Sequence, residues 1–305
     1  MADERYSGYP ASFVSAGPVT TDLAQMTSDS IRFGSQTFDY VPPGLTQRSQ
    51  VGLVSADPVI TLVTQDLVTA FGILSPTIGL SCTAATFRRQ LRSCGSTFDA
   101  GNTHYTYGCQ YGGQWIPRSI SASQDDEGGV ELTTEFHPIS DNGLNLPVAP
   151  TDNATISGVT PAFVSKFFMG PVYINAAAVT GISRWSLDFG IKVSKKRFGG
   201  IIYPTCVTID EQRPIITITA AKVNVDGVVD QFMRVLAGTI ALYGRKHATS
   251  TSRVSDVTAS HLKLSSTAGA WQVDEDSFSD TEDGMKTFNI LPTAAMAASV
   301  ASAIP

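Results

Sequence analysis

The stretch 184–193, RWSLDFGIKV, indicates most clearly which kind of fold the chain forms. Apolar side chains occupy every second position, with polar or small residues between them: Trp185, Leu187, Phe189 and Ile191 against Ser186, Asp188 and Gly190. Because successive side chains of a β-strand point to opposite faces of its sheet, this alternation predicts an antiparallel strand with one buried and one solvent-facing side.

The same alternation occurs at 128–139, GGVELTTEFHPI, where Gly128 and Gly129 supply a turn before the strand. We expect 115–124 to be the partner strand, joined to it through an acidic tip in a long hairpin. A second long hairpin is expected where Gly199 and Gly200 turn a strand at 185–194 back into 201–209.

Other segments with strand character are 31–40, 84–91, 171–175, 214–220, 260–265, 270–274 and 284–290. Helical spacing of apolar residues occurs at two places, one running from Thr64 and one following Asp226, with Gly238 placed to end the second. The sequence therefore predicts a mainly β fold: an antiparallel β-sandwich or barrel with one or two short flanking α-helices and long hairpins.

The pattern also suggests how the chain is divided. Residues 1–30 lack sustained periodicity, so we expect an extended arm or a disordered end there. Residues 31–292 should form a β-rich domain, either as one unit or as two subdomains, 31–109 and 110–292. The Ala-rich segment 293–305 is expected to be a loose tail or a short docked helix. The two long hairpins and two helices leave room for a diverged duplication.

The composition limits the classes of function. Of the 305 residues only 16% are charged, against about 25% in a typical soluble domain. Either an uncharged Ser/Thr-rich surface or burial between subunits explains the shortage. The net charge of −6 argues against tight nucleic-acid binding. No signal-peptide pattern and no apolar run of membrane-spanning length occurs, so we expect a product made in the cytoplasm with no membrane span.

No motif for catalysis, cofactor binding or metal binding is found. The sequence lacks GxSxG, HExxH, GxxxxGK[ST] and GxGxxG strings. His137 and His261 are expected at the surface, and the acidic clusters lack the ligand spacing of a calcium loop. The four cysteines are expected to be free thiols, with a Cys94–Cys109 bridge as the alternative. We therefore expect a protein that is not an enzyme and has no cofactor.

Two short charged groups are candidates for contacts between subunits. One group is acidic and one is basic, and both are expected at hairpin tips: Asp125, Asp126 and Glu127, and Lys195, Lys196 and Arg197. Opposite charges at different tips could fix the register of neighbouring copies in a heterologous assembly.

The stretches QWIPRSISASQ at 114–124, GGVELTTEFHPI at 128–139, RWSLDFGIKV at 184–193, YPTCVTI at 203–209 and RPIITIT at 213–219 carry a family resemblance. Their content and order resemble those of phage tail-tube proteins over about residues 110–292. The resemblance implies a virion structural protein whose tube-forming domain builds rings, commonly of six subunits. A duplicated unit could instead build a pseudo-hexameric ring from three chains. The rings stack into a hollow tail tube, alongside other phage tail proteins, and DNA passes through the lumen.

Other classes of protein have the same composition. A head-decoration protein or a baseplate ring subunit would also lack active-site motifs. A carbohydrate-binding β-sandwich could use Trp115, Trp185 or Trp271 as a sugar platform, although core packing is the expected role of Trp185 and Trp271. A glycosidase using the acidic loops is the remaining alternative.

Overall fold

The computed structural model describes residues 5–15, 20–23, 26–43, 50–92, 104–124, 129–154, 165–221, 236–248, 252–266, 269–280 and 285–305. In this part of the chain the structure is mainly β, with antiparallel strand pairing throughout and one helix, α1 (Leu67–Ile73). The predicted fold class is confirmed. The order of the described strands does not close on itself, so the sheets fit the sandwich form of the prediction.

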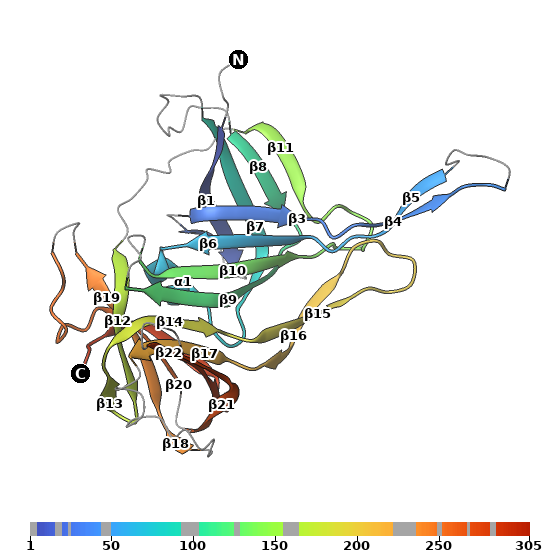
Figure 1. Ribbon diagram of the computed structural model, residues 1–305. Helices are drawn as coiled ribbons and strands as arrows, with labels where there is room; N and C mark the ends of the chain where they lie inside the picture. The colour runs from blue at the N-terminus through green and yellow to red at the C-terminus, as the bar shows by residue number, and fades with distance from the viewer. Residues whose placement is uncertain are drawn as a thin grey trace.

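The largest sheet is organised around the hairpin of β9 (Gly113–Ser123) and β10 (Glu131–Pro138), as predicted (Figure 1). Leu132 lies opposite Ile120 in this hairpin, and Phe136 lies opposite Trp115. The other edge of β10 pairs with β6, and the other edge of β9 pairs with β14 near one end and with β7 near the other. The sheet therefore branches at β9.

The remaining strands of this sheet extend from these neighbours. Beyond β10 lie β6 (Val59–Thr64) and then β3 (Met26–Arg32). Beyond β9 on one side the strands follow in the order β14 (Ile182–Asp188), β17 (Ile215–Ala221), β22 (Met285–Pro292), β21 (Gly269–Asp280) and β18 (Leu236–Gly238). The third branch contains β7 (Leu80–Arg92) with β1 (Arg5–Ser15) and β2 (Thr20–Leu23), and with β8 (His104–Cys109) and β11 (Ala149–Ala154).

Three smaller sheets complete the described part. A five-stranded sheet has the order β13 (Ala177–Val179), β12 (Lys166–Ile174), β19 (Ile240–His247), β20 (His261–Ser266) and β23 (Met296–Ser302), and the two-stranded sheets are β4 (Gln36–Tyr40) with β5 (Gln50–Ser55) and β15 (Ile191–Lys196) with β16 (Cys206–Gln212). The pairing of β15 with β16 confirms the second predicted hairpin.

The alternation at 184–193 defines the core as expected. Trp185, Leu187, Phe189 and Ile191 are all buried. The strand is nevertheless interrupted after Asp188, because Gly190 takes a positive φ of 59° and approaches the carbonyl oxygen of Arg213 so closely that a Cβ atom would lie 1.8 Å from it. The predicted single strand is therefore two, β14 and β15.

The N-terminal segment 5–15 is not the extended or disordered end that was expected for residues 1–30. Strand β1 pairs with β7, and both Ala11 and Phe13 are fully buried. The ring of Phe13 stacks on Trp115, with 4.1 Å between the ring centroids. This aromatic contact, made across a long stretch of sequence, gives β1 a place in the core that its own weak periodicity did not indicate.

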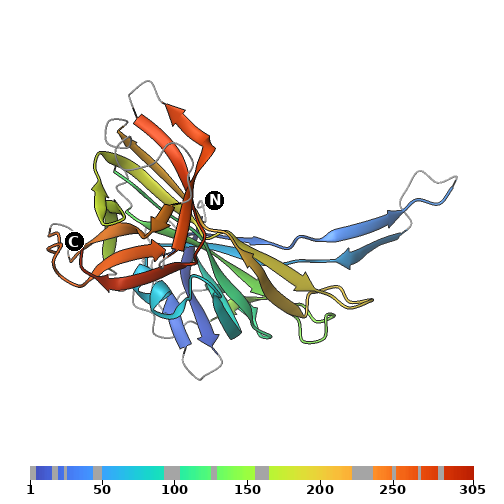
Figure 2. The same ribbon diagram turned by 90° about the horizontal axis from the view of Figure 1, so that it is seen from below.

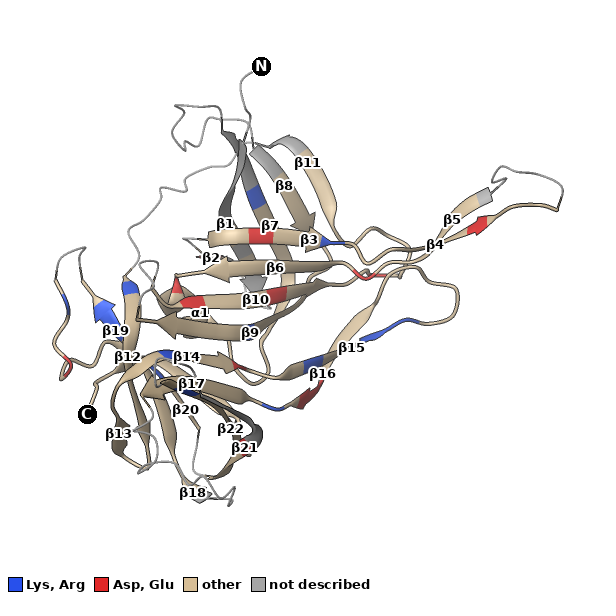
Figure 3. Cartoon of the chain, in the orientation of Figure 1, with Lys and Arg blue, Asp and Glu red and all other residues tan. Residues whose placement is uncertain are grey.

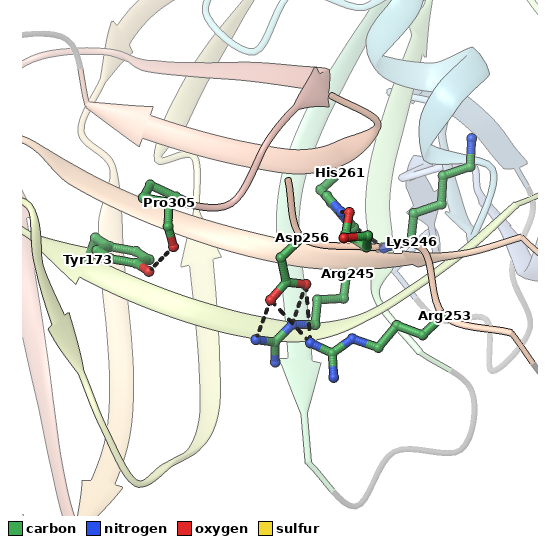
Figure 4. Close-up of polar contacts among 8 residues, drawn as sticks. Tyr173, Arg245, Lys246, Arg253, Asp256, His261 and Pro305 are labelled. Carbon is green, nitrogen blue, oxygen red and sulfur yellow. Dashed lines mark hydrogen bonds and ion pairs between the residues drawn. The ribbon is translucent and has the colours of Figure 1, made fainter. Parts of the chain in front are cut away.

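The C-terminal segment is neither a loose tail nor a helix. Strand β23 pairs with β20, and Ile304 is buried beyond its end. The hydroxyl of Tyr173 donates a hydrogen bond of 2.7 Å to the carbonyl oxygen of Pro305 (Figure 4). Alanine occupies several positions of this strand, so its period-two pattern is too weak in hydrophobicity to predict a strand.

The two helix predictions have different outcomes. Helix α1 is confirmed, although it begins at Leu67 and not at Thr64. Asp66 is its N-cap, because the Asp66 side chain accepts a hydrogen bond from the Thr69 backbone N–H. Most of the helix expected after Asp226 lies within 222–235, which is outside the described residues. Its expected last turn is contradicted, because Leu236 begins strand β18.

One arrangement occurs twice in the chain. In β3–β4–β5–β6 and again in β14–β15–β16–β17, an outer pair of strands belongs to the large sheet and an inner pair forms a separate hairpin beyond it. The two units lie on opposite sides of the β9–β10 hairpin. The duplication that the sequence left open stays a prediction.

Candidate assembly surface

The hairpin of β4 and β5, which we call the arm, projects away from the packed sheets (Figures 1 and 2). Every residue of β4 is exposed. Large apolar side chains are exposed along both strands and just beside them: Phe33, Phe38, Tyr40, Val41, Val51, Leu53 and Val54. With 63% of Val51 and 48% of Phe38 accessible, these residues are not covered by the body of the protein.

Both faces of the arm carry this apolar surface. On one face Phe38 lies opposite Gly52, and a Cβ atom on Gly52 would come within 2.3 Å of the Phe38 ring, so the ring covers this glycine. On the other face Val51 and Leu53 lie opposite Asp39 and Thr37. Within the described part of the chain, the outer edges of β4 and β5 pair with no further strand.

Two loops at the root of the arm pack against each other, and we call 140–147 together with 197–205 the double loop. The backbone N–H groups of Ile202 and Tyr203 both donate to the carbonyl oxygen of Gly143, each at 2.9 Å. The Ser140 N–H donates to the Pro204 carbonyl oxygen at 2.8 Å. These bonds fix a surface on which Leu144, Leu146 and Phe198 are exposed.

The basic candidate residues lie next to this surface, and two of the three have contacts within the chain. Arg197 forms an ion pair with Asp57, and the Lys195 ammonium donates to the Pro58 carbonyl oxygen at 3.3 Å. Burial lowers the pKa of Lys195, although Asp57 and Glu135 oppose that shift. Lys196 is exposed. The acidic candidates Asp125, Asp126 and Glu127 lie outside the described residues, so the proposed contact between the two groups stays a prediction.

A second charged group lies on β9 and β10. Arg118 Nε is 2.7 Å from Glu135 Oε2, and His137 Nε2 is 3.2 Å from the same oxygen. Burial by itself would raise the pKa of Glu135, but the proximity of His137 and Arg118 to the carboxylate outweighs it and lowers this pKa to about 2. Burial lowers the pKa of His137. The surface position expected for His137 is wrong, because only 3% of the residue is exposed.

The surface position expected for His261 is also wrong. His261 is fully buried, and its Nδ1 accepts a hydrogen bond from the Lys246 N–H at 3.0 Å (Figure 4). Its Nε2 lies 2.9 Å from the Ser255 carbonyl oxygen. A ring that accepts at Nδ1 and donates at Nε2 is neutral. Both histidines follow the polar side of their sequence pattern and are buried by elements distant in the sequence.

Sites for other functions find little support in the described residues. Trp115, Trp185 and Trp271 are each at most 1% exposed, so none can serve as a sugar platform. Among the residues that the structure describes, no cluster of His, Cys, Asp and Glu could hold a metal ion. Cys82, Cys109 and Cys206 are free thiols, and burial raises the pKa of Cys82 and of Cys109 to about 12. Cys94 lies outside the described residues.

Charged side chains are sparse over the described strands (Figure 3). In the same part of the chain, no helix has the length and apolarity needed to cross a membrane. No protein-family model matches the sequence, and no relative was found among curated proteins.

Proposed function

We propose that this chain is a self-assembling virion structural protein that builds the stacked rings of a bacteriophage tail tube. The observation that carries the proposal is the arm, with its apolar side chains exposed on both faces. An isolated two-stranded hairpin is marginally stable in water, and soluble monomers rarely leave contiguous apolar surface uncovered. We therefore infer that another protein chain packs against the apolar side chains of the arm.

A second copy of the chain is the partner that we propose. The arm leaves one end of the body, so its contact with a different surface of the next copy is head-to-tail, and such contacts generate rings or open-ended stacks. The low charge content agrees with burial between subunits. The likeness of residues 110–292 to phage tail-tube proteins supports a tube within this class, with DNA passing through its lumen and with no catalytic role.

The repeated strand–hairpin–strand unit favours one of the two ring compositions. If each chain contributes two equivalent units, three chains supply the six units of a pseudo-hexameric ring. A head-decoration protein or a baseplate ring subunit is the competing reading, since it would also expose apolar surface for assembly. The symmetry of the assembled particle separates these functions.

Negative-stain electron microscopy of the purified protein tests the proposal. We expect hollow tubes with a regular axial repeat, or flat rings with a central hole. The double variant Val51→Thr/Leu53→Thr should remain dispersed, because it removes apolar surface from the arm and places β-branched side chains, which favour a strand, at both positions. Val257→Thr is the matched control, since Val257 is 81% exposed outside the arm. A wild-type protein that stays monomeric at all concentrations contradicts the tube.

A further inference from the structure

The arm meets the body at two interruptions that face each other. Residues 33–35 separate β3 from β4, and residues 56–58 separate β5 from β6. The Asp57 N–H donates to the Phe33 carbonyl oxygen at 2.9 Å, which holds the two crossings together. Gly34 has a φ of 55°, and a Cβ atom there would lie 2.9 Å from the Asp57 carbonyl oxygen. The arm is thus a separate two-stranded sheet on a narrow joint.

The double loop and the end of β15 contact residues 56–58 of this joint. The Ala56 N–H donates to the Ile202 carbonyl oxygen at 3.0 Å. One residue further along, Asp57 pairs with Arg197, and the Pro58 carbonyl oxygen accepts from Lys195. Three consecutive residues of the joint are therefore bound by the β15–β16 hairpin and its loop.

These contacts are shielded to different degrees. Arg197 is 28% exposed at its side chain and Asp57 is 41% exposed, so their attraction is partly screened by solvent. Ala56 itself is buried. Lys195 also interacts with Glu135, so the charges at the joint extend to β10 in the large sheet. A bend of the arm away from the double loop would separate these charges and expose the Ala56 backbone.

We propose that Asp57, Lys195 and Arg197 form a latch that fixes the direction of the arm relative to the double loop. The latch presents the arm and the exposed side chains of Leu144, Leu146 and Phe198 together as one preformed surface for the next copy. Fixing a binding surface before contact reduces the ordering cost of association. This inference rests on the proposed role of the arm in assembly, and it assigns Lys195 and Arg197 a role within the chain rather than between chains.

Hydrogen exchange of arm amides in the unassembled protein tests the latch directly. The variants are Asp57→Asn, Arg197→Gln and the double variant. Each single variant should speed exchange in the arm by up to about fivefold, as expected for an ion pair worth up to about 1 kcal/mol. The double variant should add little to either single one, because both remove the same interaction. The matched control is Arg213→Gln, which removes the exposed Glu211–Arg213 pair at the far end of β16 from the joint.

The wild-type protein gives a second measurement that needs no substitution. Raising the salt concentration should speed exchange in the arm, because partly exposed charges are screened, and should leave exchange unchanged in β17, a strand without charged side chains. Arm exchange that responds neither to the variants nor to salt overturns the latch, whatever the protein assembles into.

Assembly provides the separate test of the surface. The latch variants should raise the concentration needed for tube or ring formation by up to about fivefold, while Arg213→Gln should not. If the variants loosen the arm and assembly is unchanged, the arm is not the assembly surface, and both the preformed surface and the structural basis of the proposed function fail. If the wild-type protein does not assemble, the proposed function fails, and the exchange data still decide the latch.

Discussion

The β9–β10 hairpin and the arm are both antiparallel hairpins with alternating sequence, yet they differ completely in burial. In β9–β10 the apolar positions Trp115, Ile120, Leu132 and Phe136 are at most 1% exposed, and strands pair with both outer edges. In the arm, Phe38, Val51 and Leu53 are exposed, and within the described residues each strand pairs only with the other. The chain itself covers one hairpin and leaves the other exposed.

This comparison shows that an alternating pattern predicts a strand but does not predict what packs against its apolar face. A face of Val, Leu and Phe requires an apolar neighbour, and that neighbour can belong to the same chain or to another. Stability and assembly should therefore respond to different substitutions, with core positions affecting the first and arm positions the second.

The largest expected effect is on the core hairpin. Trp115→Ala removes a fully buried indole that stacks on Phe13, and we expect it to lower the free energy of unfolding by about 3–5 kcal/mol. Denaturation in urea, followed by circular dichroism, measures the change. A loss below about 1 kcal/mol would mean that β1 and β9 do not form the centre of the core.

The charges on the same hairpin should make stability depend on pH. The folded-state pKa of Glu135, about 2, lies below its ordinary value of 4.5. Above pH 4.5 the stabilisation is fully present, and it is lost as the pH falls toward 2, because the unfolded state then binds more protons than the folded state. Glu135→Gln should be less stable than the wild type at pH 5 by at most about 3 kcal/mol.

The measurement is urea denaturation of both proteins from pH 5 downward. The difference between them should shrink as the pH decreases through this window. A difference that is constant with pH would contradict the role assigned to the carboxylate. Glu131→Gln is the control, because Glu131 is a half-buried carboxylate of the same strand that accepts a hydrogen bond from Gln65 instead of pairing with Arg118.

The sequence predicted the fold class, the two long hairpins and helix α1, because each depends on local periodicity and turn residues. It failed where the deciding contact is distant. Phe13 is buried by Trp115 about a hundred positions away, and His261 is bonded by the backbone of β19. The arm was predicted only as part of a strand at 31–40, since alternation does not reveal which faces stay uncovered. The latch was not foreseen, because Asp57 and Arg197 meet only through the fold.

A smaller effect on stability is expected for Lys196, one of the three basic candidate residues at 195–197. Lys196 is exposed, whereas Lys195 and Arg197 are bound to the joint of the arm. Lys196→Gln should therefore change the free energy of unfolding by less than about 0.5 kcal/mol. If Lys196 meets an acidic group of a neighbouring copy, the variant should weaken assembly and reduce its dependence on salt. Lys192→Gln, also exposed on β15, is the control, and equal assembly of both variants would remove Lys196 from the interface.

The smallest expected effect on stability belongs to the arm. Val51→Thr/Leu53→Thr should leave the free energy of unfolding of the unassembled protein within about 0.5 kcal/mol of the wild type, because these side chains are exposed before and after the change. Urea denaturation at a concentration below assembly measures it, beside Trp115→Ala as the positive control. A loss comparable with that of Trp115→Ala would mean that the arm packs on its own chain in solution. The contrast between the hairpins would then disappear, because both would be core elements and neither would be left for a partner.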